Sequence, residues 1–357
     1  MTEEKKEESE IRAKFAVQER DPFDDFMEHI DQNDERRPPT QEEKERMDDS
    51  LIQLGKIFEG SDINWHLDGA MNISLMKGEY IGIHKDTDVS IELDELEKLD
   101  GYLERKGYGL FLSYAKNLED PHSKKIMKRV GASNFKETPT EHPMIVAIDE
   151  QGKIREGGHL NFIDTHIVKR DENGAPVGWG EVALPKKWFE GQPIDFQGQE
   201  INISHPAKVA YFKLHGTRSY DRTDLKALAE TGKLSTEDVD EIEESFEKEF
   251  NSRKEGAEKL LNEVSDKIEP NMSAEQIFGI FAKEPMVADK IQYIEEPLRK
   301  LTKAIEASSD KSFEQIKKIA FETLNIEESF DDQRNKISEL KQWVEDVVKL
   351  KEVRDNI

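Results

Sequence analysis

The chain has 357 residues, of which 36% are charged, and its formal net charge of −26 would repel nucleic-acid phosphates over most of its surface. It contains no cysteine, which excludes disulfides, thiolate metal sites and cysteine nucleophiles. No apolar run is long enough for a membrane span and the N-terminus lacks a signal-peptide core, so we expect a cytoplasmic protein with no membrane partner.

Residues 1–46 are predicted to form an acidic, largely disordered arm. Charged side chains dominate this segment, aliphatic ones are few, and the stretch ERRPPTQEE breaks any helix there. A short helix within residues 11–30 has enough apolar side chains to dock onto the rest of the protein.

Residues 47–232 have a mixed pattern of helices and strands and are predicted to form one domain. Gly60 and Gly107 are the expected stops of two of its helices. In chain order we expect helices over 47–60, 70–78, 94–107, 204–216 and 221–232, and strands over 63–69, 82–91, 107–115, 142–152, 157–174, 177–185 and 201–204.

Residues 233–357 have only helical patterns and are predicted to form an all-helical C-terminal domain of four to six helices. Capping boxes at 273–276 and 312–315 mark two of the helix starts. The predicted fold class is therefore α+β, a mixed sheet with flanking helices followed by an all-helical domain.

The stretch GIHKDTDVSI at 82–91 places two aspartates inside an apolar alternating run. On a strand, Thr87, Val89 and Ile91 would face a core, while Asp86 and Asp88 would share the other face. Two adjacent carboxylates repel each other unless a cation or a proton lies between them. The pattern predicts a divalent-metal site; the alternative is a solvated edge strand with two exposed acids.

A third carboxylate, Asp164, lies in the apolar strand segment HLNFIDTHIV. An unpaired carboxylate in such a setting would cost several kcal/mol or would take up a proton, and metal coordination removes that cost. Because Mg²⁺ prefers hard oxygen ligands and keeps waters and phosphates, two or three protein carboxylates are enough to bind it.

A strand-to-helix turn at Gly69 and Ala70 precedes the aspartates. A glycine at such a turn lets backbone N–H groups approach a phosphate, and the helix N-terminus favours the anion. The turn at Gly69 and Ala70 is therefore a candidate phosphate-binding site.

These motifs resemble the core of the DNA-polymerase-β-type nucleotidyltransferase superfamily, and especially the antibiotic nucleotidyltransferases of the lincosamide type. Those enzymes have a glycine turn, a helix, a His-x-Asp-x-Asp strand and a helix ending near Gly-Tyr, as residues 65–108 have here. Residues 162–185 and 201–228 resemble their later strands and helix pair, so that the resemblance spans about 47–232. It implies a nucleotidyltransferase-fold mixed sheet.

The resemblance implies a metal-dependent enzyme that moves a nucleoside monophosphate from an NTP, expected to be ATP, to a hydroxyl of a small antibiotic-like molecule and releases pyrophosphate. A role in antibiotic resistance follows. Two Mg²⁺ ions are implied: Asp86 and Asp88 hold one on the triphosphate, and with Asp164 they hold a second that activates the acceptor.

Four further side chains have predicted roles with structural alternatives. His84 and Lys213 are predicted to bind the nucleotide together with the turn at Gly69 and Ala70. His166 and Arg218 are predicted to bind the acceptor. The alternatives are structural hydrogen bonds for the two histidines and a solvated helix face for the two cations. The expected partners are an NTP and a small hydroxyl acceptor, with nucleic acid disfavoured.

Two other functions remain open from the sequence. One is a toxin-like nucleotidyltransferase that modifies tRNA or a protein, although no basic stripe with interleaved aromatics supports tRNA. The other is a non-catalytic scaffold with a helical interaction module, against which stands the presence of all three candidate carboxylates.

Overall fold

The computed structural model describes residues 17–19, 36–84, 86–115, 125–131, 143–155, 163–178, 181–216, 218, 220–288, 291–324 and 326–355. The chain forms two compact units. The first comprises Met1–Val177, Ala183–Val239 and Leu340–Ile357, and the second comprises Gly178–Val182 and Asp240–Glu339. The predicted domain boundaries at residues 46 and 232 remain a proposal.

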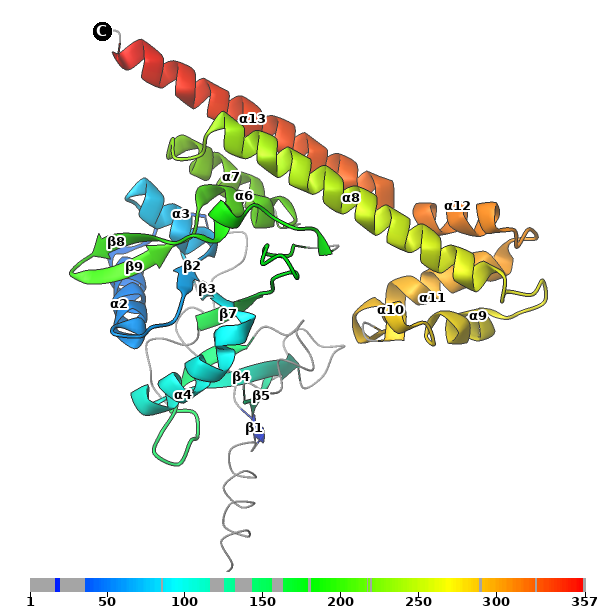
Figure 1. The fold of residues 1–357 in the computed structure, drawn as a ribbon, viewed down its shortest axis with the longest axis horizontal. Coiled ribbons are helices and arrows are strands. Elements are labelled where there is room, and N and C mark those ends of the chain that lie inside the picture. The colour runs from blue at the N-terminus through cyan, green and yellow to red at the C-terminus, as the bar shows by residue number, and fades with distance from the viewer. Residues whose placement is uncertain are drawn as a thin grey trace, which may run out of the picture. The chain divides into compact units, whose positions relative to one another are not determined.

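A mixed sheet forms the centre of the first unit (Figure 1), and its described strands run in the order β1-β5-β4-β6-β7-β3-β2-β9-β8. The pairs β3/β7 and β2/β9 are parallel and the other pairs are antiparallel. The strands are β1 Val17–Glu19, β2 Trp65–Leu67, β3 Thr87–Glu92, β4 Tyr108–Ala115, β5 Lys125–Arg129, β6 Met144–Ala147, β7 Ile163–Val168, β8 Gln192–Phe196 and β9 Gln199–Ile203.

Five helices accompany this sheet: α2 Gln41–Phe58, α3 Gly69–Lys77, α4 Leu96–Lys106, α6 Pro206–Leu214 and α7 Asp221–Glu230. α3, α6 and α7 pack against one another. α2 comes so close to β9 that a Cβ at Gly55 would meet the side chain of Gln199. The Tyr102 hydroxyl of α4 donates a hydrogen bond to the Ile57 carbonyl of α2, over 2.8 Å.

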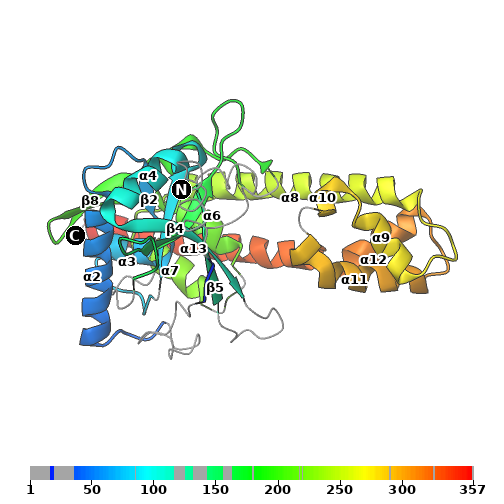
Figure 2. The same cartoon turned by 90° about the horizontal axis from the view of Figure 1, so that it is seen from below.

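The second unit is helical (Figure 2), with α8 Thr236–Ser265 and α13 Ile326–Asp355 each shared with the first unit. Between them come α9 Ala274–Phe281, α10 Pro285–Ala288, α11 Ile291–Ala307 and α12 Phe313–Thr323. Buried side chains of α8, α9, α11 and α12 form one core, to which Val264, Ile277, Ile305 and Ile316 belong. The predicted fold class is confirmed.

The alternation predicted for the aspartate strand is also confirmed. Thr87, Val89 and Ile91 are all buried, and β3 lies between β7 and β2 in the sheet. Asp88 points to the other side and is half-buried. β3 is therefore an internal strand, which excludes the solvated edge strand.

Several predicted elements differ from those observed. The described part of 177–185 forms no strand, only an isolated bridge between Val177 and Ala183. Strands β1, β5 and β8 were not predicted; the side chains of β8 are mostly exposed and give little apolar signal. α2 begins at Gln41 instead of Met47, because Thr40 and Glu43 form a capping box that extends it.

One of the two predicted capping boxes forms. The Ser273 side chain accepts from the Gln276 amide, and the Gln276 side chain accepts from the Ser273 amide. The box at 312–315 is wrong: Ser312 precedes α12, but its side chain makes no cap hydrogen bond. Its amide instead donates to Asp310 Oδ1 over 2.8 Å.

Most of the predicted arm lies outside the described residues, including most of the predicted helix at 11–30. Val17–Glu19, inside the predicted helix, instead forms strand β1 and pairs with β5, and residues 41–46 of the predicted arm belong to α2. No described helix contains a stretch long and apolar enough to cross a membrane.

Candidate active site

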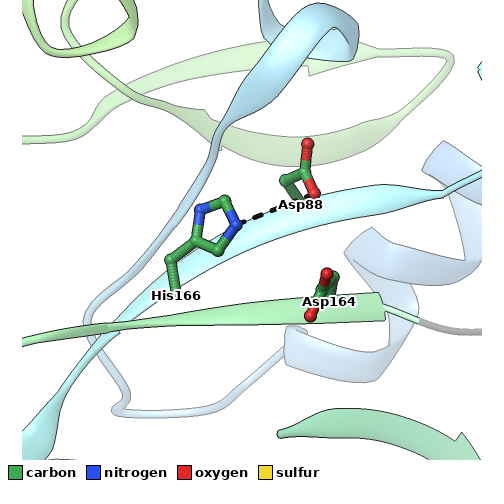
Figure 3. Close-up of side chains that lie close together, drawn as sticks. All are labelled: Asp88, Asp164 and His166. Carbon is green, nitrogen blue, oxygen red and sulfur yellow. Dashed lines mark ion pairs between the residues drawn. The ribbon is translucent and has the colours of Figure 1, made fainter. Parts of the chain in front are cut away.

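Asp88 and Asp164 are direct neighbours on adjacent strands. β3 and β7 run parallel, and their register pairs these two residues. Ligand atoms of Asp88, Asp164 and His166 all lie within 4.8 Å of one another (Figure 3). Two ligands of one Mg²⁺, each about 2.1 Å from it, lie at most about 4.2 Å apart, so a small closure would let one ion bind the group. The predicted adjacency of the two aspartate strands is confirmed.

The electrostatics of Asp88 match this arrangement. Burial raises the pKa of its carboxyl, and the charges of Asp164 and Asp68 raise it further, against the opposite influence of His166 and Lys213. A cation bound among these carboxylates would offset their mutual repulsion and stabilise the ionised form of Asp88. The residues present therefore fit a divalent ion.

The glycine turn lies directly against Asp88. Gly69 has φ +66°, and a Cβ added there would collide with Asp88 Oδ2. The Asp68 amide donates to the Asp88 carbonyl over 2.8 Å, which fixes the turn to β3. Asp68 stands at the N-cap of α3, but its side chain makes no cap hydrogen bond. The N-terminus of α3 thus begins beside the candidate metal ligands, with Ala70 in its first turn.

His166 lies between two carboxylates. Its Nε2 is 3.9 Å from Asp88 Oδ1, and its Nδ1 is 3.6 Å from Asp68 Oδ2. Burial lowers the pKa of the imidazole, but Asp68, Asp88 and Asp164 outweigh this effect and raise the pKa to about 9. The ring therefore lies in a strongly negative field, although 43% of the side chain is exposed.

Asp68, which faces Nδ1 of His166, forms a buried ion pair with Lys208 that the sequence analysis missed. Lys208 is 2% exposed and Asp68 5% exposed, and Lys208 Nζ is 2.9 Å and 3.0 Å from the two Asp68 oxygens. The ammonium also donates to Ser90 Oγ over 2.5 Å and to Ser204 Oγ over 3.1 Å, and Ser204 Oγ donates to Asp68. Burial opposes ionisation of Asp68, but Lys208, His166 and Ser204 together lower its pKa.

A sequence signal for this pair exists. Asp68 ends the apolar segment INWHL, and Lys208 is a charge inside the otherwise apolar helix start PAKVAYF. A charge in such a setting needs a partner, since an isolated buried charge is too costly. What the sequence does not reveal is that β2 and α6 bring the two together.

Asp86 and His84 lie in the segment that leads into β3. Asp86 is exposed and is not part of the metal-ligand group found among the described residues. His84 Nε2 forms a hydrogen bond with Ser74 Oγ over 3.1 Å. Burial of this ring, together with the charges of Arg36 and Lys213, lowers its pKa to about 3. His84 is therefore a neutral partner of α3.

Lys213 and Arg218 belong to a second charged cluster. Lys213 Nζ is 2.6 Å from Asp224 Oδ2 and 3.5 Å from Asp221 Oδ1, and both aspartates are fully buried. Arg218 is 56% exposed and lies 3.4 Å from Asp221 Oδ1. Both cations nevertheless act on the candidate site: the charge of Lys213 lowers the pKa of Asp88, and the charge of Asp88 helps to raise the pKa of Arg218.

Arg36 also belongs to this charged cluster, and the sequence analysis predicted no role for it. Its guanidinium binds Asp224 through two hydrogen bonds of 2.5 Å and 2.7 Å and lies 4.2 Å from the centre of the Tyr220 ring. It comes from the segment predicted to be a disordered arm. No pattern in that charge-rich segment distinguishes Arg36 from its neighbours.

Two solved structures that are similar to this chain have names that refer to nucleotidyl transfer. One is the lincosamide antibiotic adenylyltransferase LnuA with lincomycin bound, matched over 54% of this chain and 98% of that chain at 16% identity and a TM-score of 0.32. The other is an antigenic nucleotidyltransferase-like protein from Paracoccidioides brasiliensis, matched over 61% and 91% at 11% identity and a TM-score of 0.32. Both names fall in the class that the sequence resembles, but at these values neither match assigns a function.

The sequence itself matches no protein family and no curated protein.

Proposed function

We propose that this protein is a metal-dependent nucleotidyltransferase that moves a nucleoside monophosphate from an NTP, expected to be ATP, to a hydroxyl of a small antibiotic-like acceptor. The observation that carries the proposal is the pairing of Asp88 with Asp164 on adjacent parallel strands, with the Gly69 turn of α3 packed against Asp88.

Asp88 and Asp164 supply hard oxygen ligands from two strands, and Asp86 adds a third carboxylate from the segment before β3. When bound, Mg²⁺ at these carboxylates neutralises triphosphate charge and lowers the pKa of the acceptor hydroxyl. The rigid pairing of β3 with β7 holds the ligands in place before the substrates arrive, so that little reorganisation is needed during the reaction.

Gly69 and Ala70 are the proposed contacts of the triphosphate. The first turn of α3 presents backbone N–H groups with no side-chain cap from Asp68, and it lies beside Asp88. A phosphate bound there is stabilised by these N–H groups and by the helix dipole. The same phosphate lies next to the carboxylates that hold the ion.

The proposed acceptor is a small molecule, preferably a cationic one. The formal net charge of −26 favours the approach of cations over that of polyanions. Arg218, more than half exposed, is the proposed contact of the acceptor on α7's side of the site, and His84 and Lys213 remain proposed contacts of the nucleotide.

Incubation with each labelled NTP, a divalent cation and a panel of lincosamides, aminoglycosides, tRNA and proteins tests the proposal. We expect a nucleotidyl adduct, detected by mass, on a small molecule, and none with Asp88→Asn. Asp195→Asn is the matched control, since Asp195 is an exposed aspartate on the edge strand β8. An adduct on tRNA or a protein would overturn the small-molecule acceptor, and NTP binding without any adduct would overturn the activity.

A further inference from the structure

The sequence assigned His166 to the acceptor, but its position lies within the metal-ligand group. Its Nε2 faces Asp88 Oδ1 at 3.9 Å, within the about 4.2 Å that two ligands of one ion can span. Asp164 and His166 are two residues apart on β7, so both side chains point to the same face of the sheet. Figure 3 shows the ring turned toward Asp88.

The opposite ring nitrogen is oriented by the buried ion pair. Nδ1 lies 3.6 Å from Asp68 Oδ2, and Asp68 is in turn held by Lys208 and Ser204. A carboxylate behind a histidine is the usual arrangement for a metal-binding imidazole, because it fixes the tautomer and the ring orientation and makes the free nitrogen more basic. Lys208 and Ser204 are themselves buried, so they hold the Asp68 carboxylate in a fixed orientation.

We propose that His166 is a nitrogen ligand of the cation at Asp88 and Asp164, that Asp68 with Lys208 orients its ring, and that the site therefore prefers a first-row transition-metal ion such as Mn²⁺ to Mg²⁺. The inference rests on the cation site of the proposed function. Mg²⁺ prefers oxygen ligands, whereas an imidazole nitrogen ligand favours the binding of first-row transition-metal ions. Asp68 is accordingly a positioning residue, and His166 a metal ligand.

Electron spin-echo spectroscopy of Mn²⁺ bound to the full-length chain, without nucleotide and without a histidine tag, tests the proposal. An imidazole ligand adds ¹⁴N modulation to the echo decay of the manganese. We expect this modulation in the parent protein and in His215→Gln, a half-buried histidine at the end of α6 whose Nδ1 contacts the Tyr211 carbonyl. We expect its loss in His166→Gln, with Mn²⁺ still bound through the carboxylates.

The affinities of the variants for Mn²⁺ and Mg²⁺ distinguish a specific effect on the histidine ligand from a general loss of the fold. His166→Gln should weaken Mn²⁺ binding about tenfold and change Mg²⁺ binding by less than about twofold. Asp68→Asn keeps the shape of the side chain and should weaken Mn²⁺ binding about tenfold, with a weaker ¹⁴N coupling. If Asp68→Asn does not fold, the parent and His166→Gln spectra alone decide whether His166 is a ligand.

The outcomes distinguish the histidine ligand proposed here from the carboxylate cation site of the proposed function. Mn²⁺ bound without ¹⁴N modulation, or modulation that survives in His166→Gln, would overturn the histidine ligand and leave the carboxylate site intact. No Mn²⁺ binding at all would overturn both the ligand and the cation site of the proposed function.

Discussion

Lys208 and Asp68 form a deeply buried charged pair beside the candidate site. Each loses its water shell on folding. Lys208 is compensated by Asp68, Ser90 and Ser204, and Asp68 is compensated by Lys208 and Ser204. Such a pair adds little net stability relative to apolar residues, but removal of one partner leaves an uncompensated buried charge.

Lys208→Met should therefore destabilise the protein by about 3–5 kcal/mol. The double variant Asp68→Asn with Lys208→Met should recover a large part of that loss, because no buried charge is left alone. Urea unfolding of both variants measures the difference. Equal destabilisation by the single and the double variant would show that Asp68 does not depend on Lys208.

Gly69 has two reasons to be glycine, its φ of +66° and its contact with Asp88. Gly69→Ala should displace the Asp88 carboxylate and weaken cation binding at least about tenfold. Gly60→Ala is the matched control, because Gly60 has φ +71° but nothing within 4 Å of an added Cβ. It should cost only about 1 kcal/mol of stability. Metal titration of both variants checks this; equal cation affinities would mean that the Asp88 contact is unimportant.

At the scale of elements, the start of α2 depends on an ionised side chain. Glu43 accepts hydrogen bonds from Arg37, from the Thr40 amide and from the Thr40 hydroxyl. The bonds from Arg37, the largest influence, lower the pKa of Glu43 from 4.5 to about 2. Because the folded-state pKa is lowered, the stabilisation is complete above about pH 4.5 and is lost as the pH falls toward 2.

Glu43→Gln should cost about 1 kcal/mol at pH 7, and the difference from the parent should shrink as the pH falls below 4.5. Glu42→Gln is the control: Glu42 is exposed in the same turn and pairs only with Arg46 among the contacts described, so its replacement should change stability by less than about 0.5 kcal/mol. Thermal melting at pH 7 and pH 3 tests both. A loss for Glu43→Gln that is the same at both pH values would contradict this account.

Elements with strong apolar periodicity were predictable from the sequence, and elements built on polar contacts were not. β3 has Val89 and Ile91 in alternation with the polar Asp88, Ser90 and Glu92, and this alternation in the sequence reveals which side chains share a face. β8 is mostly exposed, and the 312–315 box fails because Asp310 takes the amide that the Gln315 side chain would have capped. Asp88 and Asp164 were found because carboxylates in apolar strands are costly, whereas the partners of Asp68 and His166 depend on how β2, β7 and α6 meet in space.

At the scale of the whole molecule, the site belongs to the first compact unit. Asp88 lies on β3, Asp164 and His166 lie on β7, Asp68 lies between β2 and α3, and Lys208 lies on α6. The negative charge of the chain favours divalent cations and cationic acceptors at this site, an influence that salt screens beyond about 10 Å. The triphosphate is itself an anion, so its binding must depend on a cation held by the carboxylates.

Calorimetric titration with ATP, with and without a divalent cation, tests that dependence most directly. The parent protein and Asp195→Asn should bind ATP only when Mg²⁺ or Mn²⁺ is present. Asp88→Asn should bind it at least about tenfold more weakly, because the amide keeps the shape of the carboxylate but lacks the charge that holds the ion. ATP binding by the parent without a divalent cation, or cation-dependent binding that persists unchanged in Asp88→Asn, would contradict the account.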